Sequence, residues 1–325
     1  MVDLLLGGSP CQGFSFAGKQ LNFSDPRSKL FFDFVKALEV LKPKYFLLEN
    51  VKMKKECENI ITQHLGVKPI EINSGLVSAQ DRKRLYWTNI PGIQQPKNMH
   101  IYLKDILETE TTVTKDMVLE KKYLERYQPI KNYKLNQEKS CVIGTLSKYQ
   151  GDRVFDVNGK GSSLCANGGN NAGGSCNIIW DNNELRKLTP VECERLQTLP
   201  DNYTAVGVIN GKEIPISNTQ RYKMIGNGWT VDVIAHILSF IPEKYLHTVV
   251  SLFDGISCGQ VALERAGKIY NQYYASEIDK YAIAVTQKNY PHTIQLGDVT
   301  KIDWNAFLDR LDLIQNVPCQ GSYWG

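Results

Sequence analysis

The first ninety residues alternate short apolar runs with longer amphipathic segments. An apolar run ending in Gly7-Gly8 is typical of a buried strand, and an amphipathic segment after it stops at Lys42-Pro43. Strands are predicted at 2–7, 45–48, 68–72 and 84–89. One helix is predicted to open at Asp25-Pro26-Arg27-Ser28 and to stop at Lys42-Pro43, with apolar positions between Leu30 and Leu41, and a second helix is predicted around 55–65. Strands and helices alternating at these lengths predict a parallel, doubly wound α/β sheet.

A second α/β pattern begins at residue 248, close to the end of the chain. A strand over 248–253 leads into a glycine turn and a helix over 260–266. Two further strands follow at 273–276 and 293–296, with a helix between them. This pattern is typical of the opening of an α/β domain.

Between about residues 91 and 186 the sequence pattern changes to polar turns, with a Gly/Asn-rich segment at 165–174. We interpret it as a small irregular domain. Helical signals return at Thr189-Pro190, where a capping residue precedes a proline at the first helical position, and again at 230–240. The predicted divisions are 1–91, 92–186, 187–247 and 248–325.

Composition narrows the class of protein. Hydrophobic residues make up 42% of the 325 and charged residues 22%, as in ordinary soluble globular proteins. No apolar run approaches the roughly 20 residues of a membrane span, and no signal-type start is present, so we expect a cytoplasmic protein without a membrane partner. The eight cysteines are scattered, which favours reduced thiols and no metal site. The net charge of +4 permits nucleic-acid binding without demonstrating it.

Two segments carry candidate chemistry. Pro10-Cys11 follows the first strand, which puts a thiol on a stiff loop at the edge where α/β sheets build active sites. The glycine turn after residue 253, with Glu277 at the end of the next strand, suits a cofactor that carries adenosine. Neither signal is specific alone, because most cysteines are inert and the turn lacks the Gly-x-Gly-x-x-Gly pattern.

Taken together, the motifs resemble those of the DNA (cytosine-5)-methyltransferases. The motifs are Ser9-Pro10-Cys11-Gln12, Glu49-Asn50-Val51, Gln80-Asp81-Arg82-Lys83-Arg84, Lys187 to Gln197, Gly226-Asn227-Gly228, Phe253-Asp254-Gly255, Ser276-Glu277 and Gly297-Asp298. The resemblance covers nearly the whole chain except 92–186, which corresponds to the family's variable target-recognition domain. The Phe253 turn and Trp229 are especially similar to those of animal de novo and phage enzymes.

The resemblance implies a Rossmann-like methyltransferase sheet and a mechanism. Cys11 would add to C6 of a cytosine flipped out of double-stranded DNA, and Glu49 would bond N3 of the ring. Arg84, aided by Arg82, would hold O2 of the base or a nearby phosphate. The methyl group would come from S-adenosylmethionine, and loss of the C5 proton would expel the cysteine.

The resemblance also assigns binding residues. Phe253 would pack on adenine, Gly255 would face the methionine end of the cofactor, Glu277 would bond the ribose and Asp298 the adenine amino group, with Asn227 near the methionine moiety. The remaining predicted cofactor residues are Asp254, Ser257, Gly259, Ile278, Val299 and Trp229. Gln12, Ser15 and Gln80 are the predicted DNA contacts, and the 165–174 segment either helps them or is a flexible surface loop.

The order of these motifs departs from that of the family, whose chains begin with the cofactor loop and end with the Gly-Asn-Gly helix. We therefore expect a circular permutation cut just before the cysteine strand, with residues 241–247 closing the gap. Leu311-Asp312-Leu313-Ile314 and Pro318-Cys319-Gln320-Gly321 repeat the start of the chain, either by duplication or by chance. The first copy should occupy the strand position.

Other interpretations remain open at this stage. The chain could be a tRNA cytosine-5 methyltransferase of the same family, or an inactive DNA-binding relic; the intact Cys11, Glu49 and Arg84 argue against the relic. We expect a monomer whose partner is double-stranded DNA, with a cognate restriction endonuclease as a further candidate partner. The target sequence is not encoded in a readable form.

Overall fold

The structure is a computed structural model that describes residues 1–10, 29–109, 113–166, 177–181 and 184–315. Within these residues the main sheet has seven strands in the order β16-β15-β14-β1-β2-β5-β3. Their bounds are β1 Leu4–Gly7, β2 Tyr45–Val51, β3 Ile70–Asn73, β5 Lys83–Thr88, β14 Tyr245–Leu252, β15 Ile269–Ser276 and β16 Ile294–Gln295. All neighbours pair in parallel except β5, which is antiparallel to both β2 and β3.

Strand β1 lies in the middle of this sheet, between β14 and β2. Leu4 is in register with Val249 on one side and with Tyr45 on the other. Strands β14 and β1 are neighbours, and the sheet continues from them in opposite directions. Strands β15 and β16 lie beyond β14, and β2 lies beyond β1. Such a switch point leaves a crevice at the carboxyl ends of the strands, where open α/β sheets bind ligands.

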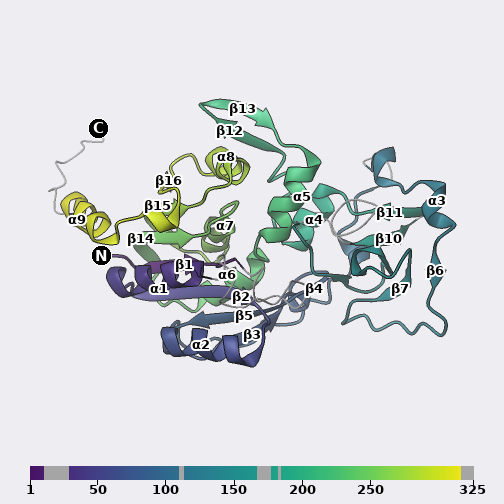
Figure 1. The fold of residues 1–325 in the computed structure, drawn as a ribbon, viewed down its shortest axis with the longest axis horizontal. Coiled ribbons are helices and arrows are strands. Elements are labelled where there is room, and N and C mark those ends of the chain that lie inside the picture. Colours follow the sequence, from purple (N-terminus) through teal and green to yellow (C-terminus); the bar gives the residue numbers. More distant parts are fainter. Residues whose placement is uncertain (11–28, 110–112, 167–176, 182–183, 316–325) are drawn as a thin grey trace.

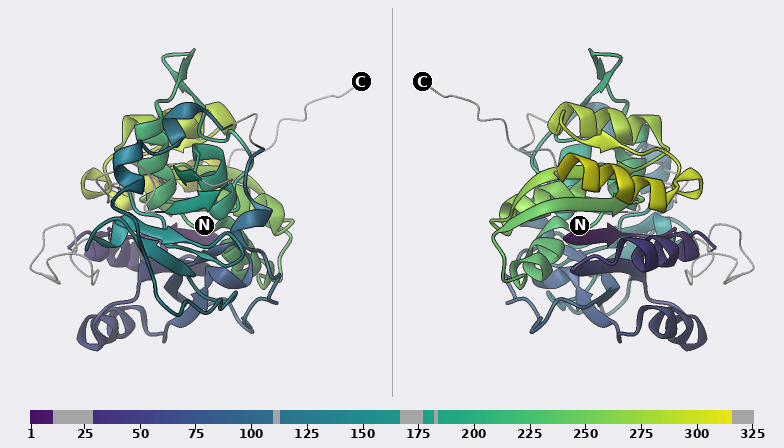
Figure 2. Two further views of the ribbon diagram at one scale, coloured as in Figure 1. Left: turned by 90° about the vertical axis from the view of Figure 1, so that its right-hand side faces the viewer. Right: turned by 90° about the vertical axis from the view of Figure 1, so that its left-hand side faces the viewer.

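Helices cover both faces of the sheet, as the two views of Figure 2 show. Helices α1 (Leu30–Leu41), α2 (Lys55–Leu65) and α9 (Trp304–Gln315) pack on the face that carries Leu5. Helices α6 (Val231–Ser239), α7 (Cys258–Arg265) and α8 (Lys280–Asn289) pack on the face that carries Leu4 and Leu6. The strand's side chains alternate between the two cores, so the predicted doubly wound α/β class is confirmed.

The inserted region has more order than its sequence indicates. Within the described residues it holds a five-stranded sheet in the order β11-β10-β8-β7-β6, set apart from the main sheet in Figure 1. The strands are β6 Gln128–Pro129, β7 Val142–Thr145, β8 Arg153–Phe155, β10 Ile178–Asp181 and β11 Glu184–Lys187, with the short helix α3 at Lys121–Leu124. The expectation of an irregular domain was therefore wrong, because strands of two to four residues leave almost no periodic signal.

The remaining elements connect the two regions. The chain returns to the main sheet through helix α4 (Pro190–Leu196), the hairpin of β12 (Val206–Ile209) and β13 (Lys212–Pro215), and helix α5 (Asn218–Asn227). Strand β4 (Gln80–Asp81) pairs with β9 (Gly161–Ser162). Short 3₁₀ helices lie at η2 Ser74–Leu76, η3 Leu103–Asp105, η4 Lys115–Met117, η5 Gln150–Asp152 and η6 Val299–Lys301. Thr189 and Glu192 form the predicted capping box at the start of α4.

The two ends of the chain bear on the predicted repeat. The first copy forms β1, whereas Leu311–Gln315 of the second copy continue helix α9. The expectation that the first copy takes the strand position is confirmed by its pairing with β14 and β2. Residues 316–325, which include Cys319, lie outside the described residues.

Residues 241–247 lie against the edge of the sheet where β1 and β2 begin. Glu243 forms an ion pair with Lys44 and accepts a hydrogen bond from the Tyr45 hydroxyl. The Asp3 carboxylate accepts hydrogen bonds from the backbone amides of His247 (2.6 Å) and Thr248 (3.1 Å). On the other side, the Lys268 ammonium group donates to the Glu243 carbonyl (3.1 Å), so the connection is bonded to both predicted halves.

Candidate active site

The candidate site lies at the carboxyl ends of β1 and β2. Beyond β1, the buried Ser9 is anchored by Asn50, whose side-chain amide donates to the Ser9 hydroxyl (3.0 Å) and carbonyl (3.3 Å). Asn50 itself is 1% exposed, and sequence reasoning assigned it no role. The sequence signal that could have indicated this role is a polar residue at the end of a buried strand. This anchor fixes the backbone that leads into Cys11. Cys11, Gln12 and Ser15 lie outside the described residues.

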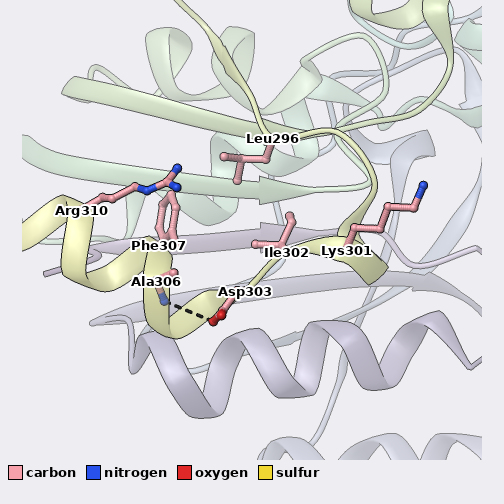
Figure 3. A pocket seen from close by; sticks show the side chains of 7 residues that line it. All are labelled: Leu296, Lys301, Ile302, Asp303, Ala306, Phe307 and Arg310. Carbon is pink, nitrogen blue, oxygen red and sulfur yellow. Dashed lines mark hydrogen bonds between the residues drawn. The ribbon is translucent and has the colours of Figure 1, made fainter.

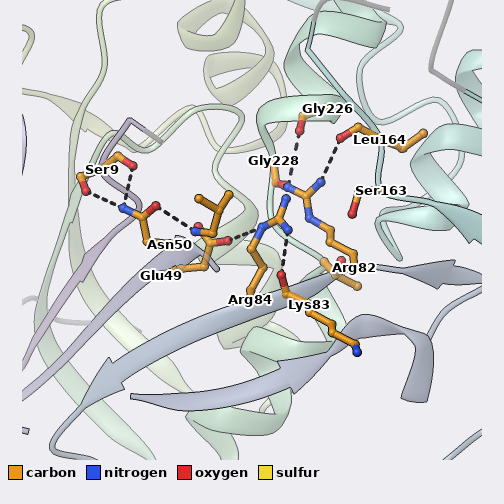
Figure 4. A network of polar contacts seen from close by, with 12 residues as sticks. Ser9, Glu49, Asn50, Arg82, Lys83, Arg84, Ser163, Leu164, Gly226 and Gly228 are labelled. Atoms are coloured by element: carbon orange, nitrogen blue, oxygen red, sulfur yellow. Dashed lines mark hydrogen bonds and ion pairs between the residues drawn. The ribbon is translucent and has the colours of Figure 1, made fainter. Parts of the chain in front are cut away.

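Glu49 and Arg84 meet beside this anchor, as Figure 4 shows. Strands β2 and β5 pair so that Val51 is opposite Arg84, which makes Glu49 and Arg84 diagonal neighbours on one face. Their Oε1 and Nε atoms are 3.1 Å apart, and the side chains are only 12% and 14% exposed. The structure therefore brings these two predicted residues together as a partly buried ion pair that keeps access to solvent.

Arg82 is placed differently from the prediction. It is 4% exposed, and its guanidinium donates to the carbonyls of Leu164 (3.1 Å), Gly228 (3.1 Å) and Gly226 (3.5 Å). These bonds point it into the protein, as Figure 4 shows, so the expected contact with the base is corrected. Unlike Arg84, Arg82 lies outside β5, between β4 and β5.

Gln80 also requires a correction. Its side chain is completely buried and its oxygen accepts the Leu164 backbone amide (2.8 Å). Its nitrogen donates to the Leu196 carbonyl and to the Gln197 side chain, both at 3.2 Å. A side chain with its amide bonded inside the protein does not reach DNA, so the predicted DNA contact is withdrawn.

The predicted cofactor loop adopts a tight, left-handed path. Phe253 (φ 59°), Gly255 (φ 60°) and Ser257 (φ 58°) all have positive φ, which costs about 1–3 kcal/mol for a residue other than glycine and persists where surrounding bonds hold it. Glu277 supplies such a bond by accepting the Gly255 amide (2.8 Å), together with the amides of Ile278 (2.7 Å) and Asp279 (2.8 Å). Apart from its two chain neighbours, none of the described residues has a heavy atom within 4 Å of where a Gly255 Cβ would stand, which leaves room for a ligand there.

Around this turn the predicted residues divide into exposed and buried ones. Ile278 is 75% exposed beside Glu277, which leaves an apolar surface uncovered at the mouth of the turn. Asp298 keeps one carboxylate oxygen bonded to the Thr300 amide and hydroxyl, and these bonds lower its pKa. Val299 and Phe253 pack with the core under α9.

Asp254 faces inward. Its carboxylate accepts hydrogen bonds from the Tyr273 hydroxyl (2.7 Å) and from Ser257, and burial raises its pKa to about 6. Gly259 lies against the same tyrosine, since a Cβ there would stand 2.7 Å from the Tyr273 oxygen. Asp254, Ser257 and Gly259 therefore support the turn from within. Their predicted direct contact with the cofactor has no geometric support.

Trp229 joins the cysteine side of the site to the cofactor side. It follows Asn227 and Gly228 at the end of α5, and a Cβ on Gly8 would stand 2.8 Å from its indole nitrogen. Cys258, at the start of α7, lies against Gly228. Burial raises the pKa of the Cys258 thiol to about 12, so it remains a protonated, unreactive thiol. Three segments far apart in the sequence thus converge here.

A separate pocket of about 300 Å³ opens between Leu296, which follows β16, and helix α9 (Figure 3). Leu296, Ile302 and Phe307 form its apolar lining, with Lys301 and Arg310 at its rim. None of the predicted site residues lines it.

Among the described residues no three His, Cys, Asp or Glu side chains are grouped to hold a metal. Nor does any described helix have the length and hydrophobicity to cross a membrane.

Comparison with known proteins decides the family. The profile of the family described as C-5 cytosine-specific DNA methylase matches residues 1–243 and 247–324. The chain belongs to this family. It is therefore a DNA (cytosine-5)-methyltransferase, with DNA as substrate and S-adenosylmethionine as methyl donor.

Individual methyltransferases are similar over most of the chain. Type II methyltransferase M.HhaI of Haemophilus parahaemolyticus is 29% identical over 261 residues, covering 72% of this chain and 74% of that protein. M.HpaII of Haemophilus parainfluenzae is 28% identical over 290 residues, with 78% and 74% covered. M1.ScrFI of Lactococcus lactis subsp. cremoris is 30% identical over 259 residues, with 76% and 63% covered, so the chain spans just under two thirds of that relative.

Proposed function

We propose that this methyltransferase acts through a covalent bond between Cys11 and a cytosine flipped out of double-stranded DNA. The thiolate sulfur adds to C6, and the electron pair of the C5–C6 double bond moves toward C5 and the ring. After C5 has gained its methyl group, a base removes the C5 proton and the C6–S bond breaks, which returns the thiolate. Cytosine C5 needs this addition because it is otherwise a poor nucleophile.

The Glu49–Arg84 pair is the observation that carries this proposal. A carboxyl that reaches N3 of the flipped base shares a proton with it as negative charge develops on the ring. Arg84 has a donor group beside that carboxyl and suits O2, the neighbouring acceptor on cytosine. The pair lies next to Ser9, two residues before Cys11 and held by Asn50. The acid and the cation come from β2 and β5, and Cys11 follows in the sequence after β1, the neighbour of β2.

Trapping on 5-fluorocytosine tests this chemistry. Fluorine at C5 cannot leave as a proton, so the adduct should accumulate as a complex of protein and DNA that survives denaturation. We expect Cys11 to be the residue joined to the base when the trapped peptide is sequenced by mass spectrometry. A trapped peptide containing another cysteine, or methyl transfer without any trapping, would refute the assignment. Labelled methyl transfer to tRNA but not DNA would favour the RNA alternative.

We also propose that the turn at 253–255 holds the cofactor. Its open backbone at Gly255 leaves room for the ligand, the Glu277 carboxylate suits two ribose hydroxyls, and exposed Ile278 offers an apolar surface for adenine. Asn227 and Asp298 remain the proposed partners of the methionine moiety and the adenine amino group. When bound, S-adenosylmethionine supplies an electrophilic methyl group.

Replacing Glu277 with alanine should weaken binding of S-adenosylhomocysteine about 10- to 150-fold, the equivalent of about 1.5–3 kcal/mol for hydrogen bonds to a charged group. Titration calorimetry measures this loss. A 2′-deoxyribose analogue separates the ribose role from the support that Glu277 gives to Gly255. If the carboxylate bonds the ribose, the variant and the analogue should not lose affinity additively. Fully additive losses would remove the ribose role.

We propose further that the chain is circularly permuted. The cysteine motif precedes the cofactor motif, yet β1 and β14 are adjacent parallel strands, and the family profile matches in two segments that meet at 243–247. The bonds of Glu243 and Asp3 across this connection support the view that it joins the two halves within one fold.

We also propose a restriction endonuclease as a functional partner, which the Type II names of the relatives support.

A chain that ends at Gln315 should keep full methyl-transfer activity and lose less than about 0.5 kcal/mol of its free energy of unfolding. The reason is that β1 already fills the strand position with completely buried leucines, so the second copy has no place in the sheet. Denaturant titration and labelled methyl transfer measure both quantities. Loss of activity in the truncated chain would mean that the second copy contributes to the site.

A further inference from the structure

A buried polar junction joins the two sheets of this methyltransferase. Arg82 occupies its centre and donates in two directions: to the Leu164 carbonyl in the inserted region, and to the Gly226 and Gly228 carbonyls at the end of α5. The three acceptors are main-chain atoms, which only a forked cation can reach together. Arg82 thereby bonds the inserted region to the turn that precedes Trp229.

Two buried glutamines extend this junction. Gln80 accepts the Leu164 amide and donates to Gln197. Gln197 donates in turn to the carbonyls of Ile225 (2.9 Å) and Gly228 (3.1 Å) and accepts from Thr230 (2.8 Å). Gln80 and Gln197 are both completely buried. A buried network in which the amides are bonded at both ends defines one arrangement of the segments that it connects.

The two sides also touch directly. A Cβ placed on Gly226 would stand 2.5 Å from the Cys165 carbonyl carbon and 2.6 Å from the Ala166 nitrogen, both main-chain atoms. Any side chain at position 226 would therefore push α5 and the segment at 163–166, which follows β9, apart. Contact at this distance means that a shift of one segment requires a shift of the other.

Each side of the junction leads to one substrate. The α5 side continues through Asn227 and Trp229 to the proposed cofactor turn, and Trp229 lies against Gly8 on the path to Cys11. The Leu164 side belongs to the inserted region that corresponds to the target-recognition domain. Arg84, two residues beyond Arg82, is bonded to Glu49. The junction thus connects the cofactor side, the base side and the recognition region.

We propose that Arg82 is a positioning residue that couples DNA binding to cofactor binding by fixing the Leu164 segment, which follows β9, against the Gly226–Gly228 turn. Each substrate then stabilises the arrangement that the other needs, so each tightens the binding of the other by the same factor. This inference rests on the proposed cofactor site, but it does not depend on the chemistry of Cys11, because binding requires no thiol.

The test measures the affinity for tritiated S-adenosylhomocysteine by equilibrium dialysis, with and without saturating DNA. The DNA is a plasmid sequence that the wild type methylates, copied with a polymerase so that it carries no methyl groups. In the wild type we expect DNA to tighten binding at least fivefold. In Arg82→Lys, which keeps the charge but loses the fork, we expect that ratio to fall close to one. Affinity without DNA should stay within threefold of the wild type, which a general loss of structure would not allow.

Gly226→Ala serves as a second variant, because it separates the same two segments without removing a charge or a hydrogen bond, and it decides the question if Arg82→Lys does not fold. Arg265→Lys is the matched control, since Arg265 pairs with Asp232 at the surface of α7 and should keep the wild-type ratio. A wild-type ratio of one would overturn the proposal. So would a folded junction variant that keeps the wild-type ratio, or one whose affinity for cofactor alone collapses. Failure here leaves the result of 5-fluorocytosine trapping unaffected.

Discussion

Replacing Cys11 with serine should lower methyl transfer to DNA by roughly 10⁴-fold or more, while affinity for S-adenosylmethionine changes by less than about threefold. A hydroxyl is a far weaker nucleophile than a thiolate, so the addition to C6 fails. The proposed cofactor turn is held by hydrogen bonds of Glu277 and Asp254, and exchanging sulfur for oxygen at residue 11 removes none of these bonds. Transfer of tritiated methyl groups and titration calorimetry measure the two quantities separately.

Two matched variants control for the loss of a thiol. Cys165→Ser changes the exposed cysteine among those described, and Cys319→Ser changes the cysteine of the second copy. Both should keep wild-type activity. Cys57, Cys141, Cys193 and Cys258 are buried and do not face a substrate. An active Cys11→Ser enzyme combined with an inactive Cys319→Ser enzyme would reverse the assignment of the nucleophile.

Replacing Glu49 with glutamine should lower kcat by roughly 10²- to 10⁴-fold, the range typical of a positioned acid. Glutamine can still bond N3 but cannot donate a proton as charge develops on the ring, and it no longer forms an ion pair with Arg84. Single-turnover methyl transfer measures the chemical step directly. The rate of adduct formation on 5-fluorocytosine DNA should fall in parallel, because both rates depend on the same addition.

The control for this prediction is Glu213→Gln, which removes the carboxylate of an exposed ion pair with Lys288, on the hairpin away from the site. It should leave kcat unchanged. Glu213→Gln should unfold within about 1 kcal/mol of the wild type, because exposed ion pairs contribute little to stability. Denaturant titration of Glu49→Gln checks that this variant is folded under the assay conditions. If Glu49→Gln kept wild-type kcat, Glu49 would not act on the base and its pairing with Arg84 would be structural.

Local sequence signals predicted most of the main sheet. The strand predicted at 45–48 lies within β2, and the strand predicted at 248–253 overlaps β14 in all but its last residue. The helix predicted to stop at Lys42-Pro43 does so, since α1 ends at Leu41. These elements were accessible because their apolar residues repeat with the period of a strand or a helix over enough residues to be recognised. Glu49 was predicted from the motif at the carboxyl end of β2, and Arg84 from the motif at the amino end of β5.

Contacts across long sequence separations were not accessible in the same way. Arg82 and Arg84 have the same charge and lie two residues apart, yet Arg84 bonds Glu49 at the site and Arg82 bonds Leu164 and Gly226 inside the protein. Gln80 is buried because Leu196 and Leu164, more than eighty residues away, close over it. No local pattern indicates which of several polar residues will meet a distant carbonyl, since that depends on how the two sheets pack.

The repeated segment separates the two kinds of information most clearly. From the sequence alone came the α/β class, the candidate nucleophile, the order of the motifs and the presence of two similar copies. Which copy becomes a strand was decided by tertiary structure: Leu4–Gly7 pair with β14 and β2, whereas Leu311–Gln315 continue a helix. Short apolar segments are compatible with either conformation, and the strand position between two parallel neighbours holds one segment. The partners that each copy meets therefore determine its conformation.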